Sequence, residues 1–292
     1  MVVLKILEAF ERRRLAFYEA LELLALTAGL KQVVRLTGTT RRLNSLAGWL
    51  KSLGLGSRVA SFHLETVFST GLGDCFSRLA PEPPAGRQAG VIFIGEPQIA
   101  EAAEELERNG CPAGPVAELY GYPKCCAENY ETDIQGGHYW LESFLRGLTG
   151  FAAAPWPMNR FGRLFQAGLT ALPDYFPCRL DCAASLELSG RYLAMLRDFK
   201  LSALVEMMAD YLRRPVLHQA GVVYQVRAAL DQDWELRPFE AEVLSAWSYG
   251  GKSLPATRLF IRPQGRGISV RVLPEDCEAR PEEKSSTFIR FY

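Results

Sequence analysis

Residues 118–130 read ELYGYPKCCAENY and place two adjacent cysteines, Cys125 and Cys126, just after Pro123. Proline is favoured in the first turn of a helix, where its missing N–H would have no partner anyway. Pro123 is therefore expected to open a helix that carries both thiols in its first turn. The unpaired backbone amides and the positive dipole end of that turn favour the thiolate form of cysteine.

A second stretch, YFPCRLDCAASLELSGRYL at residues 175–193, repeats the arrangement. Pro177 directly precedes Cys178, and Cys182 follows four residues later. In a helix opened by Pro177, these two cysteines would lie one turn apart on the same face. The sequence thus predicts two proline-opened helix starts with two cysteines each.

Four thiolates, Cys125, Cys126, Cys178 and Cys182, are a sufficient ligand set for tetrahedral zinc or for an iron–sulfur cluster. Zinc sites commonly use cysteines a few residues apart, which suits the second pair. Adjacent cysteines suit it less, because successive side chains diverge by about 100° on a helix. The pattern leaves open whether both Cys125 and Cys126 face one site.

Three other interpretations of the four cysteines stay open. One is a metal-free site in which Cys125 or Cys126 acts as a nucleophile or redox centre. Another is simple packing of two helix starts, since free cysteine is often buried. A disulfide between the two motifs is the third, although a reducing compartment disfavours it. The remaining cysteines lie in unrelated contexts and are interpreted as core or incidental residues: Cys75, Cys111 and Cys277.

Composition and charge limit the remaining possibilities. The chain has 292 residues, 48% of them apolar, and its 33 basic residues balance 33 acidic ones. Such a chain supplies an ordinary core, and no net charge steers it towards nucleic acid or an anionic membrane. The first residues, MVVLKILEAFERRR, do not resemble a signal peptide, and the apolar runs fall short of the about 20 residues that span a bilayer. We expect a cytoplasmic protein with an unknown small-molecule or protein partner.

Hydrophobic periodicity predicts a helix-rich first half of the chain. Apolar residues at three- and four-residue spacing predict helices at residues 4–28, with Gly29 as C-cap, and at 41–55. Residues 59–68 fit either a strand or a helix, and the proline-rich residues 79–90 predict a loop. VIFIG at 91–95 predicts a strand, and residues 96–110 predict the helix that follows it.

The second half changes character. Residues 183–213 predict a long helix that Pro215 ends. Residues 221–230, 258–263 and 268–274 are rich in β-branched residues, and the glycines at 265 and 267 predict a hairpin turn between the last two segments. The expected fold is α+β with mixed α/β elements and a small antiparallel β region at the C-terminus. The expected regions are 1–80, helical; 90–214, carrying the cysteine motifs; and 215–292, β-rich, or else all one compact domain.

Residues 90–190, about a third of the chain, resemble an uncharacterised prokaryotic family, domain of unknown function 483. The resemblance rests on the motifs Gly-Tyr-Pro-x-Cys-Cys, at residues 121–126, and Pro-Cys-x-x-x-Cys, at residues 177–182. It implies that Gly121, Tyr122 and Pro123 belong to the site together with the four cysteines. It implies no reaction.

Several polar residues near the motifs are further candidates. His138 follows Cys126 by 12 residues and is a candidate base or ligand, or else a loop histidine. Three acidic residues flank the cysteines, either orienting ligands or capping helices: Glu118, Glu128 and Asp181. Between the motifs, Trp156, Asn159 and Arg160 either line a pocket for a planar or anionic ligand or form a packed connector.

The sequence therefore predicts a four-cysteine site that binds zinc or an iron–sulfur cluster, for structure or for redox and sulfur chemistry. The alternatives are a metal-free cysteine-dependent enzyme and a non-catalytic binding module.

Overall fold

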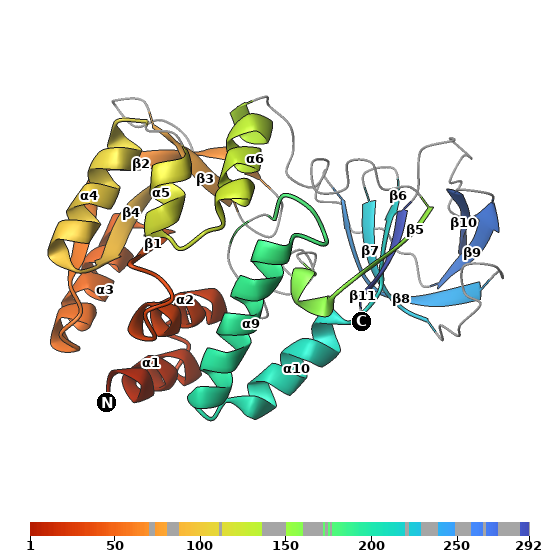
Figure 1. The fold of residues 1–292 in the computed structure, drawn as a ribbon, viewed down its shortest axis with the longest axis horizontal. Coiled ribbons are helices and arrows are strands. Elements are labelled where there is room, and N and C mark those ends of the chain that lie inside the picture. The colour runs from red at the N-terminus through yellow and green to blue at the C-terminus, as the bar shows by residue number, and fades with distance from the viewer. Residues whose placement is uncertain are drawn as a thin grey trace.

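The computed structural model describes residues 1–69, 74–80, 88–110, 113–135, 150–159, 172, 175, 177–219, 222–228, 239–248, 258–264, 267–273 and 287–291. Within these residues the chain forms eight α-helices, a short 3-10 helix and two sheets. The sheets lie at opposite ends of the molecule, with helices α9 (Ala183–Asp198) and α10 (Ser202–Leu212) between them (Figure 1). The predicted α+β class is confirmed.

Helices α1 (Val2–Glu11) and α2 (Phe17–Thr27) open the chain. The prediction of one helix over residues 4–28 is wrong, because the backbone turns between the two helices, with Arg13 in the left-handed region at φ 56°. The apolar spacing continues across this turn, so periodicity alone does not reveal it. Gly29, at φ 72°, ends α2 as predicted.

The first sheet has four strands in the order β1 (Val33–Gly38), β4 (Gln88–Gly95), β2 (Ser57–Ser69) and β3 (Asp74–Leu79), with antiparallel neighbours. The predicted strand at 91–95 lies within β4, and the ambiguous segment 59–68 lies within β2. The region expected to be helical, 1–80, also supplies β1 to β3. The predicted loop 79–90 overlaps both β3 and β4, and its residues 81–87 lie outside the described part of the chain.

Both faces of this sheet are buried, as the alternation along β4 shows. Ile92 and Ile94 belong to a core with α3 (Thr40–Ser52), whereas Val91 and Phe93 pack with α4 (Pro97–Arg108) on the other face. The predicted helices at 41–55 and 96–110 are therefore confirmed as α3 and α4. Helix α5 (Ala113–Leu119) follows α4 and leads into the first cysteine motif.

The helical segment after the second cysteine motif also has a break. One helix was predicted over residues 183–213, but α9 ends at Asp198 and α10 begins at Ser202. Lys200 adopts φ 61° in the turn, a conformation that its sequence does not signal. Helix α10 ends before Pro215, as predicted.

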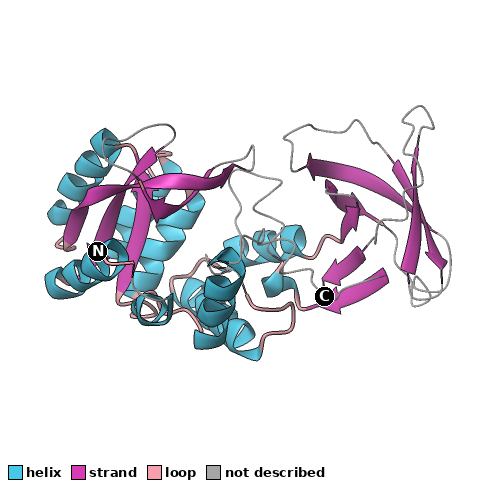
Figure 2. Ribbon diagram, turned by 90° about the horizontal axis from the view of Figure 1, so that it is seen from above, coloured by secondary structure: helices cyan, strands magenta, loops and turns pink. Residues whose placement is uncertain are grey.

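The second sheet lies on the side of the molecule that carries the C-terminus in Figure 2. It has seven strands in the order β10-β9-β8-β7-β6-β11-β5. Strands β9 (Arg258–Gln264) and β10 (Gly267–Leu273) pair antiparallel, as the predicted hairpin requires. Strand β5 (Gly150–Ala154) pairs in parallel with β11 (Thr287–Phe291), a pairing that the sequence did not indicate. The other strands are β6 (Val216–Gln219), β7 (Val222–Arg227) and β8 (Phe239–Ser248). The division of the chain into three regions stays a prediction.

The largest core joins α1, α2, α3, α9 and α10, and it includes the buried thiols Cys126 and Cys182. The cysteine motifs thus lie where the first sheet and its helices meet the central helices. Among the described helices, none has the length and apolar character that a membrane crossing requires.

Candidate metal centre

The first cysteine motif begins with a turn that needs glycine. Gly121 has φ 68°, and a Cβ there would lie 2.7 Å from the Leu30 carbonyl oxygen. The Tyr122 N–H donates to the Ala117 carbonyl at 2.8 Å, which ends α5. The turn therefore sets the direction in which the chain enters the next helix.

Pro123 begins helix α6 (Lys124–Gln135) as predicted. Its carbonyl oxygen accepts hydrogen bonds from the backbone N–H groups of Cys126, at 2.9 Å, and Ala127, at 3.1 Å. Cys125 and Cys126 consequently lie in the first turn of α6.

The second motif differs from its prediction. Pro177 does not open a helix: residues 177–181 form a turn, and Cys182 is the N-cap of α9. The Cys182 carbonyl accepts from the Leu186 N–H at 3.0 Å, which starts the helix five residues later than expected. Cys178 therefore lies in the turn, not one helical turn below Cys182.

All four sulfur atoms lie within 4.8 Å of one another. The Cys125 and Cys126 sulfurs are 3.9 Å apart, and each is 3.7 Å from the Cys182 sulfur. Four thiolates around one zinc ion at about 2.3 Å would be about 3.8 Å apart, since that is the edge of the tetrahedron. The three separations among Cys125, Cys126 and Cys182 match this edge, and the Cys178 sulfur lies within 4.8 Å of the other three.

The adjacent cysteines converge for a geometric reason. Cα–Cβ bonds tilt towards the N-terminus of a helix, so side chains of the first turn reach beyond its end. The sulfurs of Cys125 and Cys126 therefore meet in front of α6, although their positions around the helix axis differ. Both sulfurs therefore face the four-cysteine cluster.

Hydrogen bonds fix the buried side of the cluster. The Cys178 N–H donates to the Cys126 sulfur at 3.4 Å. The Ser185 hydroxyl lies 3.2 Å from the same sulfur and accepts from the Tyr175 hydroxyl at 2.6 Å. Because the Ser185 oxygen accepts the Tyr175 proton, the Ser185 proton is available to a sulfur of the cluster.

Burial and hydrogen bonding have opposite effects on the pKa values of the thiols. Burial raises the pKa of Cys126 well above its usual range, and burial with the neighbouring Cys182 raises the pKa of Cys178 to about 11. Burial also opposes ionisation of Cys182, but the hydroxyl and backbone N–H of Ser185 outweigh it and lower the pKa of Cys182 to about 7. The cluster thus contains one readily ionised thiol beside two that need a counter-charge.

An aromatic ring and a lysine ammonium pack against Tyr122 of the first cysteine motif. Tyr122 packs on Tyr175, with ring centroids 4.9 Å apart, and the ammonium of Lys31 lies 4.6 Å from the Tyr122 centroid. Lys31 forms a buried ion pair with Glu22, which also accepts from the Tyr192 hydroxyl at 3.1 Å. Sequence reasoning missed Ser185, Tyr175 and Lys31. The position of Ser185, three residues after the N-cap cysteine, was the only available signal.

The other candidate residues lie elsewhere or outside the described residues. His138 and Arg160 fall outside them. Asn159 is buried and donates to the Leu212 carbonyl at 2.6 Å, and the Arg213 guanidinium lies 5.9 Å from the Trp156 ring. These contacts join the 3-10 helix η1 (Trp156–Met158) to the end of α10.

The acidic residues near the cysteines occupy the surface. Glu128 pairs with Lys124 at 3.8 Å and Asp181 with Arg179 at 2.9 Å, and all four side chains are exposed. Glu118 is exposed on α5. Glu128 and Asp181 therefore pair with basic residues that lie a few positions earlier in the chain.

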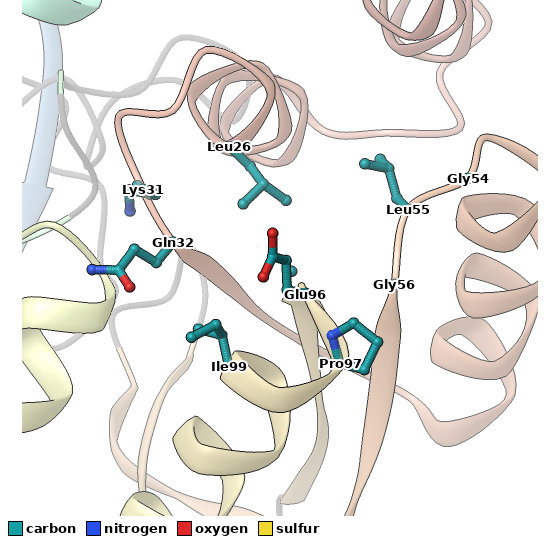
Figure 3. A pocket seen from close by; sticks show the side chains of 10 residues that line it. Leu26, Lys31, Gln32, Gly54, Leu55, Gly56, Glu96, Pro97 and Ile99 are labelled. Carbon is teal, nitrogen blue, oxygen red and sulfur yellow. The ribbon is translucent and has the colours of Figure 1, made fainter.

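A cavity of about 470 Å³ lies beside the first turn of α4 (Figure 3). Its walls include Leu26, Leu55 and Ile99, with the Glu96 carboxylate between them. None of the predicted candidate residues that the structure describes lines it. Lys31 links it to the cysteine motif, because Lys31 also contacts Tyr122.

Comparisons of the chain with protein-family models, with curated proteins and with solved structures found no match.

Proposed function

We propose that Cys125, Cys126, Cys178 and Cys182 bind one zinc ion in a structural site that joins the start of α6 to the start of α9. The observation that carries the proposal is the sulfur separation of 3.7 to 3.9 Å among three of the ligands, with the fourth within 4.8 Å of each. One tetrahedral zinc ion needs sulfurs about 3.8 Å apart, which is the separation of these three.

The same spacing favours one ion over a four-iron cluster. In such a cluster each thiolate binds a different iron, so its sulfurs surround a body of several atoms and lie further apart than ligands of one ion. Zinc accepts four thiolates in a tetrahedron without any redox change, which suits a site that holds two chain segments together.

Four protein ligands fill the tetrahedron and leave no open position for substrate, which is the pattern of structural zinc sites. The ion would supply the counter-charge that the buried thiols of Cys126 and Cys178 need. A reducing compartment such as the cytosol would keep these thiols available. We propose in addition that the chain is a relative of domain of unknown function 483, because the residues that carry this resemblance are those that converge on the site.

The test is metal analysis of protein purified without oxygen, with an ultraviolet–visible spectrum. We expect about one zinc per chain and no visible colour. The matched variants are Cys182→Ser, which should lose zinc, and Cys75→Ser, which should retain it because Cys75 lies on β3. Brown protein with several irons would contradict the proposal, and metal-free protein with fast-reacting thiols would favour a cysteine-dependent enzyme instead.

A further inference from the structure

The four cysteines differ sharply in exposure. Cys126 is fully buried, Cys182 is 3% exposed and Cys178 is half-buried, whereas Cys125 is exposed. Of the four cysteines, Cys125 is therefore the one that a small reagent from solvent meets first. Oxidation of cysteine follows thiolate character and access, and a zinc-bound thiol is already a thiolate.

Two buried thiols lie within reach of Cys125. The sulfur of Cys182 is 3.7 Å away and that of Cys126 is 3.9 Å away. Disulfides normally join Cα atoms at least about 4.4 Å apart. Consecutive Cα atoms are only about 3.8 Å apart, so a Cys125–Cys126 disulfide would be strained. Cys182 belongs to a distant segment and escapes this restriction.

We propose that Cys125 is a site of oxidation by peroxides and that it forms a disulfide with Cys182 that releases the zinc. This inference rests on the proposed function, because it concerns the zinc-loaded site. It assigns two roles within the cluster: Cys125 is the attacked thiolate, and Cys182 is the resolving one.

The chemistry balances in two steps. The Cys125 thiolate attacks one oxygen of hydrogen peroxide; an S–O bond forms, the O–O bond breaks, and the departing hydroxide takes a proton to become water. The Cys182 thiolate then attacks the Cys125 sulfur; the S–S bond forms, the S–O bond breaks, and the hydroxide that leaves takes a proton from solvent, as the first one does, to become water. The two thiolates lose two electrons in total, peroxide gains them, and zinc keeps its charge.

In the oxidised product, a disulfide replaces the zinc ion as the cross-link between the two cysteine motifs. Zinc retains only Cys126 and Cys178 as ligands and dissociates. The disulfide still joins the start of α6 to the N-cap of α9, so the two helices stay connected while the ion leaves. A dithiol reductant would reverse the step and restore the site.

The test uses the full chain, reduced and loaded with zinc, and one equivalent of hydrogen peroxide. Zinc release is followed with a chromogenic chelator, and the disulfide is mapped by mass spectrometry of unreduced peptides. We expect one zinc released per Cys125–Cys182 disulfide. Release from Cys125→Ser should be at least about tenfold slower, because access governs oxidation. Cys75→Ser, the matched control, should release zinc at the wild-type rate.

A second measurement covers the case in which Cys125→Ser holds no zinc. In Cys182→Ser the resolving thiol is missing, so dimedone should label Cys125 as a sulfenic acid. A first disulfide that contains Cys178, or equal release from wild type and Cys125→Ser, would overturn the inference. A protein that takes up no zinc fails the proposed function at the loading step, and mapping of its oxidised form then decides the pairing.

Discussion

The sulfur atoms of Cys126 and Cys182 lie 3.7 Å apart, although 56 residues separate them in the chain. Cys126 lies in the first turn of α6 and Cys182 is the N-cap of α9, so two helix N-termini face one cluster. The positive dipole ends of both helices favour thiolates there. This arrangement offsets part of the cost of gathering four thiolates at a partly buried point.

The Ser185 hydroxyl should tune the affinity for zinc without being a ligand. We expect Ser185→Ala to weaken zinc binding by about 10- to 100-fold, the usual effect of losing a hydrogen bond to a metal ligand. Competition with a chelator of known affinity measures it. Ser189→Ala is the matched control, because Ser189 is equally buried on α9 but donates to the Leu172 carbonyl. Equal affinities for the two variants would contradict this role of Ser185.

Gly121 should be needed for the fold of the first motif. Alanine at this position would bring a Cβ to 2.7 Å from the Leu30 oxygen and would strain the backbone at φ 68°. We expect Gly121→Ala to lower the free energy of unfolding by about 1–3 kcal/mol in urea denaturation. Gly48→Ala, in an exposed turn of α3 with no atom within 4 Å of the added Cβ, should instead stabilise by about 0.5–1 kcal/mol. Equal changes in the free energy of unfolding for the two variants would contradict this prediction.

The affinity for zinc should rise with pH. Cys126 and Cys178 have raised pKa values, so at neutral pH each holds a proton that zinc must displace. Cys182, with a pKa of about 7, adds a third proton as the pH falls through 7. We expect the logarithm of the association constant to rise by about two or more per pH unit between pH 6 and 8. Calorimetry in buffers of different ionisation enthalpy counts the protons, and a pH-independent affinity would contradict the expectation.

The buried ion pair behind Tyr122 should matter more than a surface pair. Lys31→Met would leave the Glu22 carboxylate buried without the Lys31 ammonium, although the Tyr192 hydroxyl still donates to it, and we expect a loss of about 3 kcal/mol in the free energy of unfolding. Lys5→Met removes an exposed pair with Glu8 and should change stability by less than about 1 kcal/mol. Similar losses in both variants, measured by urea denaturation, would show that the buried pair has no special weight.

Much of this architecture can be predicted from the sequence, because the signals lie close in the chain to the features that they predict. Pro123 and the first turn of α6, the C-cap at Gly29, and the strand at residues 91–95 all follow from rules about neighbouring residues. The four cysteines stand out for a similar reason, since they occur as two pairs beside prolines. Each of these signals lies within a few positions of the feature that it predicts.

The errors arise where the decisive contact is not local. Arg13 and Lys200 adopt left-handed conformations that break two predicted helices, and neither residue type signals such a turn. The late start of α9 puts Cys178 in a turn, yet its sulfur still joins the cluster. The hydrogen bond from Tyr175 to Ser185 and the contact of Lys31 with Tyr122 depend on tertiary packing, which no spacing in the sequence reveals.

The central claim is that one zinc ion binds all four cysteines. X-ray absorption at the zinc edge, on protein loaded with one equivalent of zinc without oxygen, tests it most directly. The account predicts four sulfur neighbours at about 2.3 Å and no nearby metal. A first shell that contains nitrogen or oxygen in place of any sulfur, or protein that fails to hold the ion, would contradict it.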